Sequence, residues 1–115
     1  MNISVNKQNG ILIVSITGEI DMYESPLFHE QYLSLSATNP ACAIIIDLQK
    51  TTYIDSSGIG VLFRIFSDAK ERNVLFCMCN TIGMVEKLLR LSHMSSILPI
   101  EKNLACAIER VKVKS

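Results

Sequence analysis

The chain of 115 residues has the length of one domain and is long enough to bury a core without disulfides or metals. Hydrophobic residues make up 49% of it, well above the content of a disordered chain, so we expect a single domain over residues 1–115. Eleven basic and eleven acidic residues cancel and are mixed along the sequence. This balance argues against nucleic-acid binding, which relies on a basic surface.

No apolar segment approaches the roughly 18–20 residues that cross a bilayer, and the N-terminus lacks the pattern of a signal peptide. We therefore expect a cytoplasmic protein without a membrane span. In that reducing compartment the cysteines are expected to be free thiols. They are Cys42, Cys77, Cys79 and Cys106. Cys77 and Cys79 point to the same face of a strand, but no histidine is near them in sequence, which favours packing over metal binding.

The first two predicted elements form a β-hairpin. Residues 3–7 alternate weakly, as an edge strand does, and residues 11–17 are rich in β-branched side chains. Between them Asn9-Gly10 is a strong hairpin turn signal, because both residues tolerate positive φ. The two strands are therefore predicted to pair antiparallel, and Gly18 is predicted to end the second one.

A helix is expected after this hairpin. Asp21 stands three residues before Glu24 in an arrangement like a capping box, which makes Asp21 a candidate N-cap. Pro26 suits the first turn of a helix, and apolar residues extend the pattern to about Ala37. Asn39-Pro40 then ends the connection.

Strands and helices alternate through the rest of the chain. Strands are expected at residues 42–48, 74–79 and 97–100, the last being the weakest pattern. Helices are expected at about residues 57–72, 84–91 and 101–114. Each strand–helix–strand step implies a right-handed parallel crossover. The predicted fold is α/β, with a mixed sheet of four or five strands that opens with the antiparallel hairpin and is covered by about four helices.

The segment from Asp55 to Gly60 falls where a buried strand ends and a helix begins. Partners and ligands meet open α/β sheets at that edge. A helix N-terminus also offers unpaired N–H groups and a partial positive charge, which stabilise a phosphate. The same residues fit a structural role, with Asp55 or Ser56 as N-cap and the glycines allowing close packing. Spacing alone leaves both interpretations open.

Residues 46–63, IDLQKTTYIDSSGIGVLF, closely resemble the signature of anti-sigma factor antagonists, the STAS domain family. The match extends upstream to residues 17–21 and downstream to residues 85–89, so it covers essentially the whole chain. Its most specific part is the Asp-Ser-Ser-Gly core. The resemblance implies a STAS-like fold, in agreement with the predicted order of elements. The family usually carries a glycine near Ser92-His93, and none is present here, which leaves the geometry of that loop open.

The resemblance implies a protein-interaction switch that acts in transcription regulation and is not an enzyme. The serine after the Asp, here Ser56, is phosphorylated in that family by a cognate anti-sigma factor of the ATP-binding serine kinase type. The unphosphorylated form binds that anti-sigma factor and frees a sigma factor, and a PP2C-type phosphatase restores it. The alternative is a STAS-type accessory subunit of a lipid-transport complex or signalling assembly, a role in which the serine is often missing. A third possibility is a small-ligand binder that uses the helix N-terminus as an anion site.

A helical wheel places Ser56, Ile59, Gly60 and Phe63 on one stripe. Ile59 and Phe63 are predicted at the flank between core and solvent, where they would contact a partner beside the serine, and Gly60 would let its backbone approach closely. Both apolar residues also suit an ordinary core role. The residues predicted to bind the partner are Asp21, Asp55, Ser57, Gly58, Ile59, Gly60 and Phe63.

No catalytic pattern accompanies these motifs. His29 and His93 are far apart, and no serine lies in a Gly-x-Ser-x-Gly elbow. The Gly58-Ile59-Gly60 segment lacks the third glycine of a dinucleotide loop and the lysine of a phosphate-binding loop. No paired carboxylates suggest acid–base chemistry, so no catalysis, cofactor or metal is expected.

Overall fold

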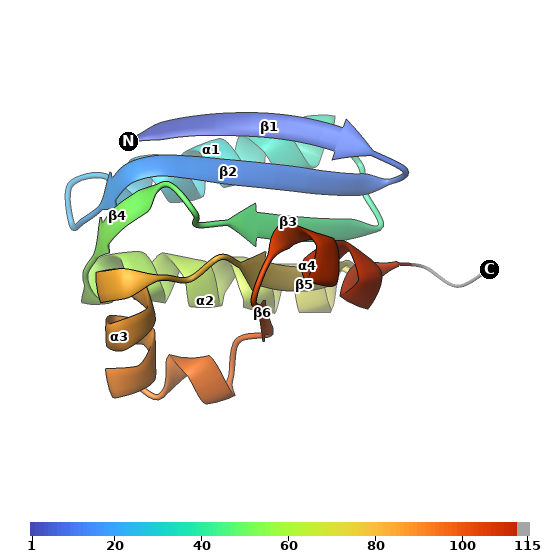
Figure 1. The fold of residues 1–115 in the computed structure, drawn as a ribbon. Coiled ribbons are helices and arrows are strands. Elements are labelled where there is room, and N and C mark those ends of the chain that lie inside the picture. Colours follow the sequence, from blue (N-terminus) through green and yellow to red (C-terminus); the bar gives the residue numbers. More distant parts are fainter. Residues whose placement is uncertain (113–115) are drawn as a thin grey trace.

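A tight turn at Asn9-Gly10 joins the first two strands. In the computed structural model, which describes residues 1–112, β1 (Asn2–Gln8) and β2 (Ile11–Ile20) pair antiparallel on either side of this turn (Figure 1). The two turn residues have φ of 52° and 79°, which asparagine and glycine adopt more readily than other residues. The predicted hairpin is confirmed.

Strand β2 continues past its predicted end and pairs with two further strands. Its first half pairs in parallel with β3 (Ala43–Asp47), and its last residues pair with β4 (Thr51–Ile54). Between these halves Gly18 adopts a φ of 101°, and the pairing register shifts between Gly18 and Glu19. The prediction that Gly18 ends the strand is wrong, because β2 continues through the glycine to Ile20 and pairs with β4, where Thr52 is the extra residue of the irregular pairing.

The sheet has six strands in the order β1-β2-β3-β5-β6, with β4 beside β2. β5 (Leu75–Cys79) and the two-residue β6 (Ile100–Glu101) complete it, and every pairing after the hairpin is parallel. The predicted mixed sheet is confirmed. β4 is the strand that the sequence analysis missed, since it is short and its two central side chains, Thr52 and Tyr53, are exposed.

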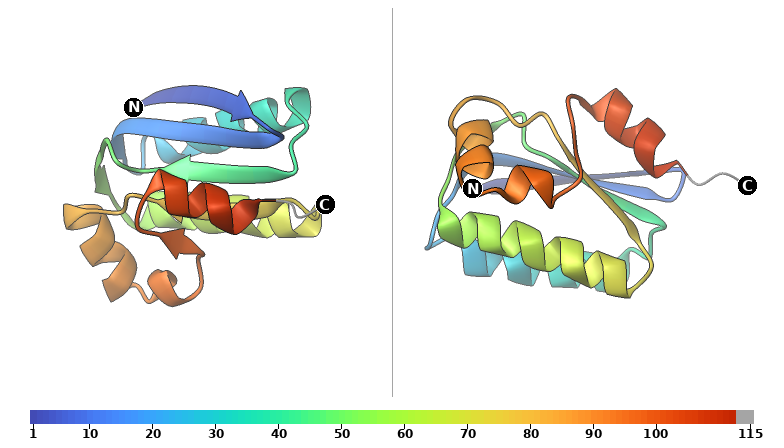
Figure 2. Two further views of the ribbon diagram at one scale, coloured as in Figure 1. Left: turned by 45° about the vertical axis from the view of Figure 1, so that its right-hand side comes forward. Right: turned by 90° about the horizontal axis from the view of Figure 1, so that it is seen from below.

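Helices cover both faces of the sheet (Figures 1 and 2). α1 (Ser25–Thr38) and α2 (Ser56–Glu71) lie side by side on one face, and α4 (Leu104–Val111) lies on the other. α3 (Gly83–Leu91) packs near β4 and leads into a 3-10 helix, η1 (Met94–Ser96). The predicted closing helix over 101–114 begins later, because Asn103 caps α4 by accepting the Cys106 N–H at 2.8 Å. Its predicted last residues, 113 and 114, lie outside the described residues.

Each face of the sheet has its own core. The larger one gathers β2, β3 and β5 side chains against α1 and α2, with Phe28 and Leu62 among its fully buried members. The smaller one lies under α4 and contains Cys77 and Cys79. Both thiols are fully buried there, and burial raises the pKa of Cys77 to about 11 and that of Cys79 to about 12. The two cysteines therefore pack as neutral small hydrophobes.

The loop that lacks the usual family glycine keeps a backbone shape that favours glycine. His93 has a φ of 62°, in the left-handed region, and precedes η1. His93 therefore holds a backbone conformation that glycine would adopt with less strain. No helix within residues 1–112 has the length and apolar character needed to span a membrane.

Candidate functional site

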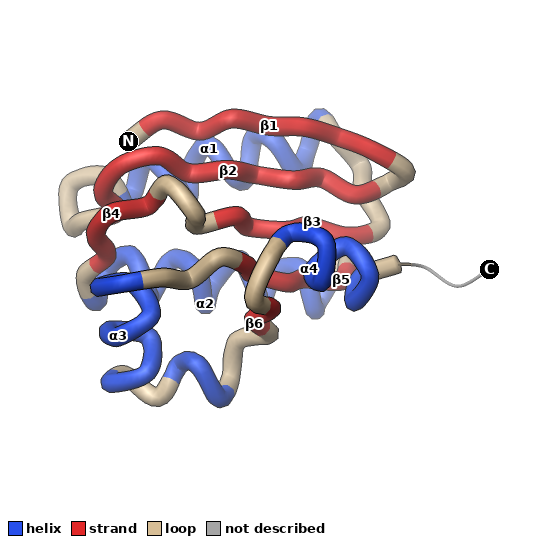
Figure 3. The backbone as a smooth tube through the Cα atoms, in the orientation of Figure 1, coloured by secondary structure: helices blue, strands red, loops and turns tan. Residues whose placement is uncertain are grey.

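The carboxyl ends of β2, β4 and β5 meet at one end of the molecule, where their loops gather (Figures 1 and 3). Ile20 and Ile54 are partners in the parallel pairing of β2 with β4. The residues that follow them, Asp21 and Asp55, therefore emerge side by side. This is the edge at which open α/β sheets receive ligands and partners.

Asp55 ties the start of α2 to the loop between β2 and α1. Its Oδ1 accepts the Gly58 N–H at 3.1 Å and caps the helix. Its Oδ2 accepts the N–H of Met22, across the loop, at 2.9 Å. Of the two N-caps proposed from the sequence, the structure has Asp55. Because one carboxylate serves both segments, it fixes the position of the loop relative to the helix.

Asp21 organises the turn that precedes α1. Its Oδ1 accepts the N–H groups of Tyr23 and Glu24 at 3.0 and 2.9 Å, and its carbonyl oxygen accepts the Ser25 N–H at 2.8 Å. α1 begins only at Ser25, and the N-cap position belongs to Glu24, which makes no side-chain cap. The prediction that Asp21 is the N-cap of α1 is wrong, because a turn intervenes between the aspartate and the helix.

Ser56 and Ser57 are exposed at the first two positions of α2. The N–H groups of Gly58 and Ile59 are taken by the side chain and the carbonyl of Asp55. Within residues 1–112, the N–H groups of Ser56 and Ser57 have no acceptor. The site therefore combines an exposed hydroxyl with two free donors at the positive end of a helix.

The two glycines of the segment play different parts. Gly58 is buried, and a Cβ built there would overlap the Ile20 carbonyl oxygen and stand 2.6 Å from Cγ1 of Ile54. Gly58 therefore lets α2 approach the ends of β2 and β4, which is the structural role left open by the sequence. A Cβ at Gly60 would meet no atom within 4 Å, so this glycine faces open space.

The helical wheel is right for Phe63 and wrong for Ile59. Phe63 is 38% exposed, whereas Ile59 is only 6% exposed and belongs to the larger core. The error arises because Ile59 lies in the first turn of α2, which Gly58 draws close to the ends of the strands. Phe66, three residues after Phe63, is half-buried and packs its ring 5.5 Å from that of Phe76, centre to centre.

Four exposed apolar side chains at this end of the sheet escaped the sequence analysis. Met22 and Tyr23 lie in the loop held by Asp55, and Tyr23 is 82% exposed. Ile82 and Met84 flank the first residue of α3, which packs against β4, and both are exposed. The sequence could have indicated these residues by their position alone, since each lies shortly after the carboxyl end of a strand. We call these four residues, together with Asp21, Asp55, Ser56, Ser57, Gly60 and Phe63, the loop-end surface.

Removing the carboxylate of Asp55 is expected to loosen the loop-end surface. Asp55→Ala should lower the free energy of unfolding by about 1–2 kcal/mol, because it deletes an N-cap together with a second hydrogen bond. Asp55→Asn is the matched control, since its single carbonyl oxygen can serve Gly58 or Met22 but not both, and it should lose about half as much. Urea unfolding measures both variants. Equal stability of Asp55→Ala and the wild type would contradict this role.

Comparison with known proteins places the chain in a family. Residues 2–107 match the STAS domain. A relative from Paenibacillus polymyxa, named anti-sigma F factor antagonist, is 26% identical over 115 residues, which cover 100% of this chain and 98% of the relative.

Solved structures of low sequence identity share the fold. An anti-sigma factor antagonist from Mycobacterium paratuberculosis superposes with a TM-score of 0.82 at 22% identity, covering 96% of this chain and 92% of that one. The Bacillus cell fate determinant SpoIIAA, solved in its phosphorylated form, superposes with a TM-score of 0.72 at 15% identity, covering 96% of this chain and 100% of that one. With its family match over residues 2–107, its six-stranded mixed sheet and its Asp-Ser-Ser-Gly helix start, the chain belongs to the STAS domain family.

Proposed function

We propose that this chain is an anti-sigma factor antagonist whose binding to an anti-sigma factor is switched off by a phosphate on Ser56. The observation that carries the proposal is the exposed Ser56 hydroxyl at the start of a capped helix, beside a loop that the cap itself holds in place. The names of its relatives support the same role. In this proposal the protein acts in the cytoplasm, and the chain itself catalyses no reaction.

The unphosphorylated loop-end surface suits a protein partner. Met22, Tyr23 and Phe63 offer exposed apolar contacts on the loop and helix that adjoin the serine, and Met84 adds one on α3, which packs against β4. Gly60 adds an open position where a partner's backbone can approach without meeting a side chain. Large apolar residues that surround polar backbone groups are typical of interface centres.

A phosphate on Ser56 would change this surface locally. It adds a charge of roughly −1.5 to −2 at a place already bordered by the carboxylates of Asp21 and Asp55. The free N–H groups of Ser56 and Ser57 can hold the phosphate without any rearrangement of the helix. Bulk and negative charge at the centre of the surface are then enough to release the partner. The phosphate would come from the anti-sigma factor, a serine kinase of the ATP-binding type, and a PP2C-type phosphatase would remove it.

The test is phosphorylation of variants by the cognate kinase with ATP. We expect Ser56→Ala to lose labelling altogether and Ser57→Ala, the matched neighbour, to keep it. Site mapping by mass spectrometry should place the phosphate on Ser56 in the wild type, and Ser56→Asp should bind the anti-sigma factor more weakly than the wild type does. Undiminished labelling of Ser56→Ala would refute the switch. Equal binding by wild type and Ser56→Asp would contradict release by negative charge, and no binding by either protein would favour an accessory subunit instead.

A further inference from the structure

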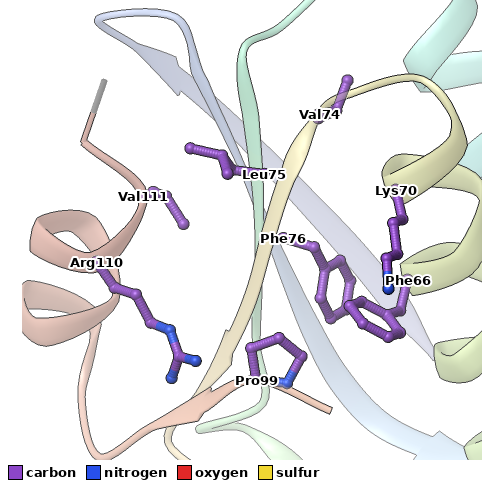
Figure 4. A pocket seen from close by; sticks show the side chains of 8 residues that line it. All are labelled: Phe66, Lys70, Val74, Leu75, Phe76, Pro99, Arg110 and Val111. Atoms are coloured by element: carbon purple, nitrogen blue, oxygen red, sulfur yellow. The ribbon is translucent and has the colours of Figure 1, made fainter. Parts of the chain in front are cut away.

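A cavity of about 290 Å³ opens between α2 and α4 at the outer side of β5 (Figure 4). Phe66 and Lys70 come from α2, while Arg110 and Val111 come from the end of α4. The rest of the lining is Val74, Leu75, Phe76 and Pro99. The lining is thus mainly apolar, with one cation on each helix.

This cavity lies in the plane of the sheet, where a further strand would add. Side chains of a strand alternate between its faces. Phe76 points toward α2, where its ring packs against Phe66, and Leu75 points to the α4 side and is 47% exposed. A cavity that borders both of these residues therefore follows the edge of β5, not one of its faces.

Within residues 1–112, β5 is unpaired along this edge at Phe76, and Pro99 explains why the Phe76 carbonyl has no donor there. Pairing with β6 begins at Met78, whose N–H donates to the Pro99 carbonyl at 2.9 Å. The Leu75 N–H points to the opposite side of β5, toward β3, and donates to the Cys42 carbonyl oxygen at 3.0 Å. Because the backbone groups of successive residues alternate in direction, the N–H and C=O of Phe76 face outward. If the parallel pairing of β5 with β6 continued two residues toward the start of β5, the Phe76 carbonyl would accept the N–H of residue 99. Residue 99 is a proline, which has no N–H to donate. Within residues 1–112, no hydrogen bond reaches these outward groups.

The charge at this edge is positive. The Lys70 ammonium lies 6.0 Å from the centre of the Phe66 ring and has no ion-pair partner within residues 1–112. Among residues 1–112, the ion-pair partner of Arg110 is Glu101, at 3.6 Å. Two cations and one carboxylate thus flank the open edge, a balance that favours an acidic ligand.

We infer that the open edge of β5 is a second docking site, which takes an extended acidic segment of a partner protein by strand addition. Main-chain hydrogen bonds to Phe76 would hold such a segment, its apolar side chains would enter the cavity, and its acidic side chains would meet Lys70 and Arg110. Lys70 lies 14 positions beyond Ser56 on α2, about 21 Å at 1.5 Å per residue. The site is therefore remote from the loop-end surface, and both surfaces can be occupied at once.

Selection from a displayed library of random eight-residue peptides tests this inference. The test variant is the double substitution Lys70→Glu/Arg110→Gln, which changes two exposed side chains at the open edge. The control is Lys87→Glu, which replaces an exposed lysine elsewhere on the surface. Because Lys70 and Arg110 lie on opposite faces of the sheet, we expect selected peptides to carry acidic residues at both odd and even positions, with apolar residues between them. They should bind the double variant about tenfold more weakly than the wild type, and the Lys87→Glu control unchanged. Failure to enrich any peptide, or equal affinity for all three proteins, would overturn the proposal.

Hydrogen exchange of the wild-type protein then locates the bound peptide. Without peptide, the Phe76 amide should exchange faster than that of Met78, which is bonded to Pro99. A selected peptide should slow Phe76 exchange at least tenfold. Slowing confined to the residues around Ser56 would contradict strand addition at β5. Neither result depends on phosphorylation of Ser56.

Discussion

Replacing Gly58 by alanine should lower the free energy of unfolding by about 3 kcal/mol, the upper range for an overpacked core position. The added methyl group would overlap the Ile20 carbonyl oxygen and stand 2.6 Å from the Ile54 side chain. The first of these neighbours is backbone in a paired strand, so α2 itself would have to move away from β2 and β4. Urea unfolding followed by circular dichroism measures the loss.

Gly60→Ala is the matched control for this substitution. It places the same methyl group in the same helix, two residues on, where no atom lies within 4 Å. Alanine is the better helix former, so this variant should gain about 0.5–1 kcal/mol of stability. Opposite signs for the two variants would tie Gly58 to packing and Gly60 to the surface. Equal effects of the two would show that helix propensity, not the approach of α2 to the strands, decides both.

The elements that could be predicted from the sequence are those whose signal is local. The Asn9-Gly10 turn, the buried segment at β3 and the apolar spacing of α2 depend on a few neighbouring residues. β4 depends on a partner, since its four residues form a strand only because β2 extends past Gly18 to pair with them. Glycine is a usual strand terminator in a sequence, and its place inside a continuous strand becomes visible only with the second partner strand in place.

The candidate site likewise has features that follow from local sequence and features that depend on residues far apart in the chain. Asp55 as a cap and Ser56 as an exposed hydroxyl follow from the position of the motif at a helix start. The second hydrogen bond of Asp55, to Met22, joins residues 33 positions apart and has no local signal. The depth of Ile59 likewise depends on how closely Gly58 lets the helix approach the sheet. A helical wheel gives the direction of a side chain, but not the distance of the helix from its neighbours.

Phe63→Ala is expected to weaken binding of the anti-sigma factor by about 2 kcal/mol, roughly thirtyfold, if Phe63 fills a pocket of the partner. Phe63 lies seven residues after Ser56 on the same stripe of α2 and keeps 38% of its surface exposed. A fully buried phenylalanine costs about 3–5 kcal/mol of stability when it is cut to alanine. With this exposure, the loss in folding should stay near 1 kcal/mol.

Leu62→Ala is the matched control, since Leu62 precedes Phe63 and is fully buried in the larger core. Its loss of stability should be about 2–5 kcal/mol, while the protein that remains folded should bind with wild-type affinity. Urea unfolding and isothermal titration of both variants separate the two effects. If Phe63→Ala unfolds as readily as Leu62→Ala and its folded fraction binds normally, Phe63 belongs to the core. The partner must then be held by the loop that Asp55 ties down, where Met22→Ala and Tyr23→Ala would carry the loss in binding instead.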